Sequence, residues 1–133
     1  MVHKKLRILI AEDSEVMARA LSRLLHSRFD VVGICRNGKE ALQSVQDLQP
    51  DVVVLDILMP IMDGIKVARS LGTLNTTAKT IMLTGLEDPK IVNAAFAAGA
   101  DGYVFKRRLT NDLLTAIDAV WAGEVFVSPN GSR

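Results

Sequence analysis

Short apolar segments alternate with longer stretches of mixed polarity along the whole chain. Five of the short segments are continuous runs rich in Val, Ile and Leu, a pattern typical of strands that are buried on both faces of a sheet. These segments are LRILIA (6–11), DVVGIC (30–35), VVVLD (52–56), TIMLT (80–84) and GYVF (102–105). The pattern therefore predicts five short buried strands.

The stretches between these segments have apolar residues at the spacing of amphipathic helices. Three of the stretches begin with a side-chain cap, Ser14, Asp63 or Thr110, and one begins with a first-turn proline, Pro89. The expected helix starts are Ser14, Gly38, Asp63, Pro89 and Thr110, and the helix that starts at Pro89 is expected to end at Gly99. Strand and helix thus alternate five times.

This alternation predicts parallel pairing of the strands with right-handed crossovers. The expected fold is a single doubly wound (βα)5 domain of the α/β class, flavodoxin-like, with a parallel five-stranded sheet in the order 2-1-3-4-5. In such sheets ligands bind beyond the carboxyl ends of the strands. We therefore expect functional residues at the carboxyl ends of the predicted strands.

Three acids follow neighbouring strands of the predicted sheet. Glu12 and Asp13 come after the first strand, and Asp56 ends the third. Asp51 stands at the other end of the third strand, about 16 Å from Asp56 at the usual rise per residue. Asp63 follows a loop and is better used as a helix cap. We therefore expect Glu12, Asp13 and Asp56 to converge in one crevice.

Thr84 ends the fourth strand and Lys106 follows the fifth, at the same edge of the predicted sheet. Two carboxylates about 4 Å apart repel by roughly 4 kcal/mol at an effective dielectric near 20, so three of them need compensating charge. Oxygen ligands favour Mg²⁺, and Lys106 adds a further positive charge. Carboxylates, a hard metal, a lysine and a hydroxyl suit phosphoryl transfer, with Asp56 as the nucleophile that forms an acyl phosphate.

Composition narrows the functional classes further. The 133 residues are 49% hydrophobic and 23% charged, and the formal net charge is +1, so charge alone does not indicate nucleic-acid binding. The single cysteine, Cys35, excludes an internal disulfide and is interpreted as a buried structural thiol. No segment approaches the roughly 18 apolar residues of a membrane span, and we expect a soluble cytoplasmic protein with no membrane partner.

The segments AEDS, VVLDILMPIMDG, IMLTG and GADGYVFKR together resemble the receiver domain of two-component response regulators, in motif order and spacing. The resemblance covers about residues 5 to 125. It implies that Asp56 accepts phosphate from a sensor histidine kinase and that Asp13, Asp56 and the backbone carbonyl of Leu58 bind Mg²⁺. It also implies that Glu12 acts on the metal through water.

The same resemblance implies a conformational switch. Lys106 and Thr84 would contact the phosphoryl oxygens, and Tyr103 matches an aromatic residue that moves inward when Thr84 is drawn toward the phosphate. Phosphorylation would then change the surface formed by the fourth helix, fifth strand and fifth helix. Such a protein is a switch, not an enzyme that turns over an external substrate. We also expect phosphorylation to promote a homodimer, partly because the last helix is apolar and carries Trp121.

The end of the chain, AIDAVWAGEVFVSPNG, resembles the end of the receiver in LuxR/NarL-type regulators. Those proteins continue through a linker to a helix-turn-helix DNA-binding domain, and no stretch of this chain has that pattern. The expected organisation is a receiver over residues 1–125 and a tail over residues 126–133 that begins a linker to an absent output domain. A stand-alone receiver, acting by protein contact or in a phosphorelay, is the alternative.

Four positions depart from the commonest receiver pattern. Arg107 stands where many receivers have proline, so the isomer of the Lys106–Arg107 bond is left open, since a non-proline cis bond costs roughly 3 kcal/mol. Gly85 stands where alanine is commoner. Leu58 and Leu86 are apolar at positions that influence attack of water on the phosphate in the family.

Three other kinds of protein fit the sequence less well. A haloacid-dehalogenase-type phosphatase would need an aspartate where Leu58 stands, and neither the G-x-G-x-x-G nor the P-loop pattern of nucleotide-binding proteins occurs. A pseudo-receiver with an inactive site is disfavoured by the complete set of site residues.

Overall fold

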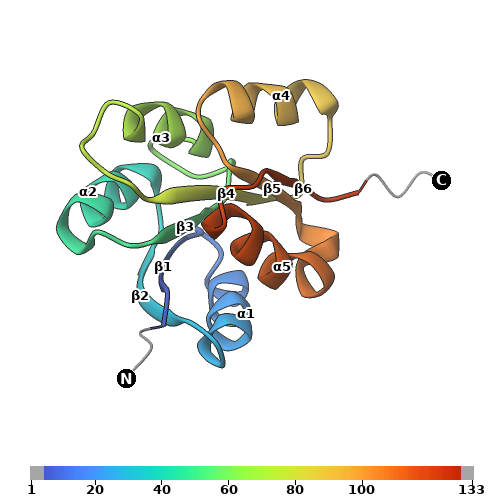
Figure 1. Cartoon of the computed structure of the whole chain (residues 1–133). Helices are drawn as coiled ribbons and strands as arrows, with labels where there is room; N and C mark the ends of the chain where they lie inside the picture. Colours follow the sequence, from blue (N-terminus) through green and yellow to red (C-terminus); the bar gives the residue numbers. More distant parts are fainter. Residues whose placement is uncertain (1–4, 130–133) are drawn as a thin grey trace.

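A parallel sheet of six strands runs through the middle of the molecule, with helices on both of its faces (Figure 1). This computed structural model describes residues 5–129. The strands are β1 (Arg7–Ala11), β2 (Asp30–Cys35), β3 (Val52–Leu55), β4 (Lys79–Thr84), β5 (Gly102–Phe105) and β6 (Phe126–Val127). The order is β2-β1-β3-β4-β5-β6, which confirms the predicted order of the first five strands and adds a sixth at the edge.

The helices are α1 (Glu15–His26), α2 (Gly38–Leu48), α3 (Gly64–Leu71), α4 (Pro89–Ala97) and α5 (Leu109–Trp121). Helices α2, α3 and α4 cover one face of the sheet, and α1 and α5 cover the other (Figure 1). A short 3₁₀ turn, η1 (Lys106–Arg108), joins β5 to α5. Among residues 5–129, no helix has the length and apolar character needed to cross a bilayer.

Two of the predicted side-chain caps are confirmed and one is wrong. Ser14 accepts a hydrogen bond from the Met17 amide, and Asp63 caps α3. Thr110 is not a cap, because α5 already begins at Leu109. The η1 turn precedes that residue, and the Leu109 amide donates to the carbonyl of Lys106, so the chain is helical before it reaches Thr110.

Alternate strand residues face two separate cores because side chains alternate across a strand. Along β1, Leu9 packs with α2, α3 and α4, whereas Ile8 packs with α1 and α5. The prediction that every strand is fully buried is wrong for β2. It forms one edge of the sheet, and Ile34 is exposed while Cys35 is buried as expected.

The segment interpreted from the sequence as a tail begins with a strand of the sheet, Phe126–Val127. Phe126 pairs with Gly102 and Val127 with Tyr103, in parallel register. The Ser128 amide then donates to the carbonyl of Tyr103 at 2.9 Å. The remaining residues assigned to the tail, 130–133, lie outside the described residues.

Candidate functional site

Three carboxylates meet at the carboxyl ends of β1 and β3. One oxygen from each of Glu12, Asp13 and Asp56 lies within 4.8 Å of the others. Glu12 is 1% exposed and Asp56 is 5% exposed, whereas Asp13 is exposed to solvent. The predicted convergence of these acids is therefore observed, with two of them buried at the base of the site.

Backbone hydrogen bonds fix the two buried acids. The Asp56 amide donates to the carbonyl of Ala11 at 3.0 Å, and the Glu12 amide donates to that of Cys35 at 2.9 Å. These bonds continue the sheet pairing one residue beyond the strands. Asp51 lies at the opposite end of β3, where it accepts a hydrogen bond from the Arg7 amide, so it is not part of the site, as predicted.

The loop after Asp56 is held against the start of α3 by a close backbone approach. The Gly64 amide donates to the carbonyl of Ile57 at 2.8 Å. A Cβ atom on Gly64 would lie only 2.3 Å from the carbonyl oxygen of Asp56, so only glycine fits without displacing the loop. No local pattern predicts this contact, because it depends on how α3 packs.

Lys106 bridges the two buried acids. Its Nζ donates to Asp56 Oδ2 at 2.8 Å and lies 2.9 Å from Glu12 Oε1. The second contact is an ion pair whose angles do not make a hydrogen bond, so Oε1 is the one buried side-chain oxygen of the described residues without a hydrogen bond. Burial alone would lower the pKa of Lys106, but its close contacts with the charged Asp56 and Glu12 outweigh burial and raise that pKa. Lys106 is therefore charged.

Glu12 is less well compensated. Burial raises the pKa of its carboxyl, the nearby Asp56 charge adds to this, and the contacts with Lys106 and the Ser14 amide only partly oppose it. Three carboxylates face one lysine, so the site carries an excess of negative charge. A cation bound directly or through water would offset the excess negative charge and would also give Glu12 Oε1 a partner.

The donor set fits a hard divalent cation. All candidate ligands are oxygens, as Mg²⁺ prefers, and opposite ligands of Mg²⁺ are about 4.2 Å apart. The 4.8 Å span of the three carboxylate oxygens is close to that value. Leu58 follows on the same loop, and its amide donates to Asp56 Oδ1 at 3.3 Å. Asp13, Asp56 and Glu12 are thus the residues that could hold the ion.

Thr84 and Tyr103 are linked through the backbone of one residue, Leu86. The Leu86 amide donates to Thr84 Oγ1 at 3.4 Å, and the Tyr103 hydroxyl donates to the Leu86 carbonyl at 2.7 Å. Both Thr84 and Tyr103 are fully buried, so the aromatic ring occupies the inward position. Burial, with smaller contributions from the charges of nearby acids, raises the pKa of Tyr103 to about 12.

The two arginines that follow Lys106 make different contacts. Arg107 is exposed and forms an ion pair with Glu87 at 2.7 Å. Arg108 donates two hydrogen bonds to Asp112, at 2.8 and 3.1 Å. No peptide bond between residues 5 and 129 is cis, so the Lys106–Arg107 bond, whose isomer the sequence left open, is trans.

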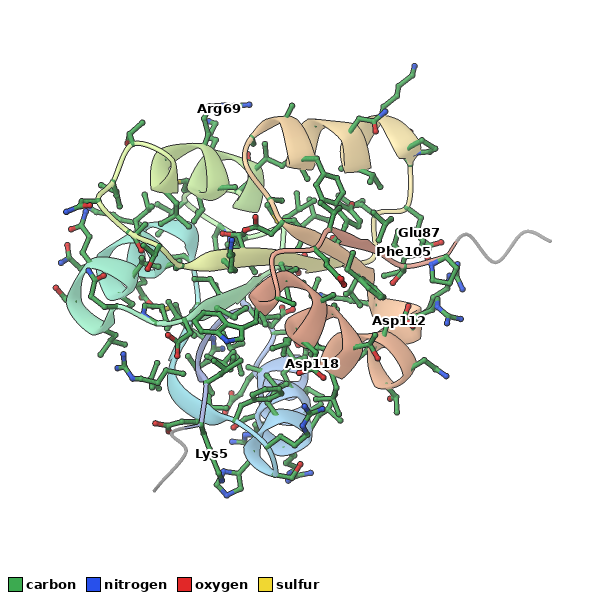
Figure 2. The ribbon with its side chains drawn as sticks, in the orientation of Figure 1. Lys5, Arg69, Glu87, Phe105, Asp112 and Asp118 are labelled. Atoms are coloured by element: carbon green, nitrogen blue, oxygen red, sulfur yellow. The ribbon has the colours of Figure 1, made fainter. Side chains whose placement is uncertain are left out.

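A second polar cluster near the site was missed by sequence reasoning. Asp112 on α5 is 6% exposed and Ser128 after β6 is 3% exposed. The Ser128 hydroxyl donates to Asp112 at 2.7 Å and accepts from the Phe105 amide at 3.0 Å. Phe105 and Asp112 lie at the same end of the sheet, close to Glu87 (Figure 2). No local pattern could have identified this cluster, because its partners are 16 and 23 residues apart.

Comparison with known proteins gives a consistent result. A family model described as the response regulator receiver domain matches residues 8–118. The uncharacterized transcriptional regulatory protein YvfU of Bacillus subtilis is 38% identical over 93% of this chain and 63% of its own length. The chemotaxis protein CheY of Halobacterium salinarum is 33% identical over 86% of this chain and 95% of its own length.

Solved structures show the same likeness. A two-component response regulator of the LuxR family from Aurantimonas sp. superposes with a TM-score of 0.90 at 30% identity, covering 95% of this chain and 91% of that one. The chain spans only 57% and 63% of the length of the first two curated relatives, which are transcriptional regulatory proteins.

Proposed function

Because the chain belongs to the response regulator receiver family, we propose that it is a phosphorylation-controlled switch of a two-component system. Asp56 would accept the phosphoryl group from a sensor histidine kinase. The observation that carries this proposal is the position of Asp56, buried at the end of β3 with Oδ2 on the lysine ammonium and two further carboxylates within 4.8 Å. Asp51 and Asp63 have structural contacts elsewhere.

In the proposed reaction, an oxygen of Asp56 attacks the phosphorus of a phosphohistidine. The P–N bond breaks as the new P–O bond forms, and the electron pair stays on the histidine nitrogen. Lys106 then stabilises charge on the phosphoryl oxygens, and the hydroxyl of Thr84 donates to one of them.

Mg²⁺, held by Asp13, Asp56, the Leu58 carbonyl and through water by Glu12, would neutralise negative charge on the transferring group. The chain would catalyse only its own phosphorylation and slow dephosphorylation, so we do not propose a turnover enzyme.

The signal would travel through Thr84 and Tyr103. A phosphoryl group adds charge and strong hydrogen-bond acceptors next to Thr84. Movement of the Thr84 hydroxyl toward the phosphoryl group would break the hydrogen bond that Thr84 accepts from the Leu86 amide. The carbonyl of the same residue, Leu86, accepts from the Tyr103 hydroxyl, so the change would reach Tyr103. The equilibrium between two arrangements of α4, β5 and α5 would shift as a result.

The output we propose is control of transcription in the cytoplasm, through a DNA-binding domain that these residues do not contain. Similarity to transcriptional regulatory proteins that are longer than this chain supports it. A stand-alone receiver that acts by protein contact or in a phosphorelay is the second candidate, supported by the 95% coverage of a CheY protein. The size of the protein in cell extracts, measured with an antibody to this domain, separates the two.

The proposed phosphorylation is tested by intact mass after incubation with Mg²⁺ and acetyl phosphate. We expect the wild type to gain one phosphoryl group and Asp56→Asn to gain none. Asp51→Asn is the matched control, because Asp51 lies on the same strand but outside the site, and we expect it to be labelled like the wild type. Phosphoryl labelling of Asp56→Asn would contradict the proposal. A folded wild type that gains no phosphoryl group would contradict it as well.

The proposed metal site predicts that Mg²⁺ binds the unphosphorylated protein. Isothermal titration calorimetry should detect binding to the wild type and its loss in Asp13→Asn, since the exposed Asp13 can be changed without disturbing the core. Equal Mg²⁺ affinity for both proteins would remove Asp13 from the site.

We further propose that phosphorylation promotes a homodimer, in which the exposed Trp121 at the end of α5 takes part. Sedimentation with and without beryllofluoride, a phosphoryl mimic, should show a higher mass with the mimic. The same mass under both conditions would count against dimerisation.

A further inference from the structure

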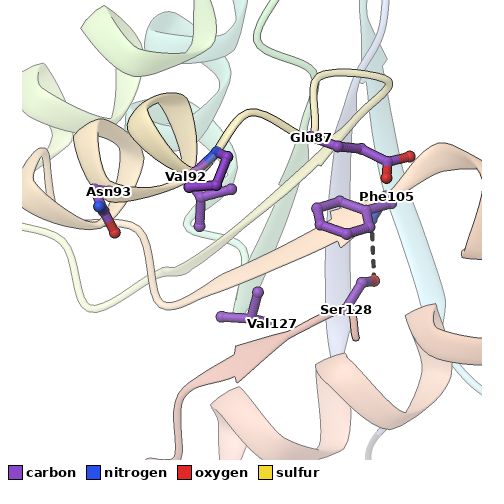
Figure 3. Close-up of a pocket in the computed structure, with 7 residues that line it drawn as sticks. Glu87, Val92, Asn93, Phe105, Val127 and Ser128 are labelled. Atoms are coloured by element: carbon purple, nitrogen blue, oxygen red, sulfur yellow. Dashed lines mark hydrogen bonds between the residues drawn. The ribbon is translucent and has the colours of Figure 1, made fainter. Parts of the chain in front are cut away.

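Ser128 joins the end of the described chain to the end of β5. Its hydroxyl accepts a hydrogen bond from the Phe105 amide at 3.0 Å, as Figure 3 shows, and donates to Asp112 at 2.7 Å. Its amide donates to the carbonyl of Tyr103 at 2.9 Å. Ser128 therefore contacts the backbone of both residues that flank Val104 on β5, one of which immediately precedes Lys106.

The same cluster also holds the chain on the other side of Lys106. Asp112 accepts the Ser128 hydroxyl and both hydrogen bonds from Arg108. We call Ser128, Asp112 and Arg108 the Ser128 clip. The clip fixes residues 105 and 108, and Lys106 lies between them with its ammonium 2.8 Å from Asp56. A shift of the clip would therefore move the backbone that carries Lys106.

Besides these side-chain bonds, the segment Phe126–Ser128 is held by a short pairing with β5 and by the half-buried Phe126, which packs against the core under α1 and α5. The strand β6 has two residues, and the bond from the Phe126 amide to Asp101 is long, at 3.4 Å. An open hollow of about 210 Å³ lies between α4 and this segment, and Val127 on its wall is 43% exposed (Figure 3). A two-residue strand beside an open hollow has few other contacts to hold it, so we expect the hydrogen bonds of the clip to add to its docking.

We propose that Ser128 is a positioning residue for the phosphoryl site: through Phe105 and Asp112 it holds Lys106 in place. Docking of the segment Phe126–Ser128 is then coupled to occupancy of the site. This inference rests on the proposed function, since it assumes that Lys106 contacts a phosphoryl group. By linkage, each event must favour the other by the same factor.

The first test compares the affinities of wild type and Ser128→Ala for beryllofluoride in the presence of Mg²⁺. Alanine removes the hydroxyl that both accepts from Phe105 and donates to Asp112. We expect affinity to fall about fivefold, the equivalent of about one ordinary hydrogen bond, because only part of the energy of the two lost bonds acts on the position of Lys106. Thr115→Ala is the matched control, because it removes an exposed hydroxyl from α5, and its affinity should equal that of the wild type.

The second test needs no variant, so it stands even if Ser128→Ala is poorly folded. Hydrogen exchange of the Ser128 and Phe105 amides is measured in the wild type with and without saturating beryllofluoride. We expect exchange of both amides to slow by about the same fivefold factor. A purely structural clip would protect these amides equally in both states.

The outcomes separate the inference from the function on which it rests. Unchanged exchange rates in a wild type that binds beryllofluoride, or wild-type affinity in Ser128→Ala, would overturn the positioning role and leave the switch intact. A wild type that neither binds beryllofluoride nor accepts phosphate on Asp56 would overturn both.

Discussion

The close approach of α3 to the loop that follows Asp56 makes Gly64 an informative position for a single substitution. Replacing Gly64 by alanine places a Cβ atom 2.3 Å from the carbonyl oxygen of Asp56 and 2.9 Å from the Cα of Ile57. Both neighbours are backbone atoms, so no flexible side chain can rotate away. Either α3 or the loop that carries Asp56 must move.

The cost follows from the size of this overlap. Ordinary contacts of a Cβ atom begin near 3.4 Å, so the new atom intrudes by about 1 Å. Overpacking costs about 1–3 kcal/mol, and we expect about 3 kcal/mol for Gly64→Ala because the backbone yields least. For a domain of this size, that free energy lowers the melting temperature by about 12 °C. Movement of Asp56 should also weaken Mg²⁺ binding.

Thermal unfolding followed by circular dichroism measures this effect, and Gly85→Ala is its matched control. Gly85 also lies next to the site, but a Cβ atom there would meet nothing within 4 Å. We expect Gly85→Ala to melt at the wild-type temperature or slightly above it, since alanine restricts the unfolded chain. Melting of Gly64→Ala within about 2 °C of the wild type would refute the argument that close packing requires glycine.

Three further predictions follow from single residues. The pKa of the only tyrosine, Tyr103, is raised to about 12, so absorbance at 295 nm should show no tyrosinate near pH 10. The free energy of unfolding should fall between about pH 10 and pH 12, because tyrosine in the unfolded state loses its proton first. A titration midpoint near pH 10 in the folded protein would show an exposed ring. Ile61 is exposed at a φ of 73°, so Ile61→Asn should raise stability by about 1 kcal/mol in urea unfolding, and a lowered midpoint would contradict the strain. Burial alone would raise the pKa of Asp112, but hydrogen bonds from Arg108 and Ser128 outweigh it and lower that pKa, so its stabilisation is present above about pH 4 and lost in stronger acid. Asp112→Asn should therefore lose about 2 kcal/mol at pH 7 and less at pH 3, and an equal loss at both values would exclude the charge as the cause.

Much of the architecture could be predicted from local patterns in the sequence. Continuous apolar runs identified the first five strands, and the alternation with amphipathic helices fixed their parallel order, because right-handed crossovers leave few other arrangements. The same order placed Glu12, Asp13 and Asp56 together, since the residue after a strand must lie at the edge of a parallel sheet.

Other features depend on contacts that no local pattern specifies. The strand β6 is only two residues long and exists because β5 leaves an open edge for it to pair with. The bonds of Ser128 to Phe105 and Asp112 join residues 23 and 16 positions apart, so they depend on how α5 and the segment after β6 pack on the sheet. Thr110 had the right chemistry for a helix cap, but the turn after β5 starts the helix one residue earlier.

The sequence by itself thus determined which residues could take part in phosphoryl chemistry and at which end of the sheet they lie. The tertiary structure alone decided how the site is held. Gly64 is required because α3 meets the Asp56 loop at backbone contact, and Lys106 is flanked by a cluster that includes the end of the described chain. Strand ends follow from periodicity along one segment, whereas close approach and long-range hydrogen bonds are set by how separate segments pack against each other.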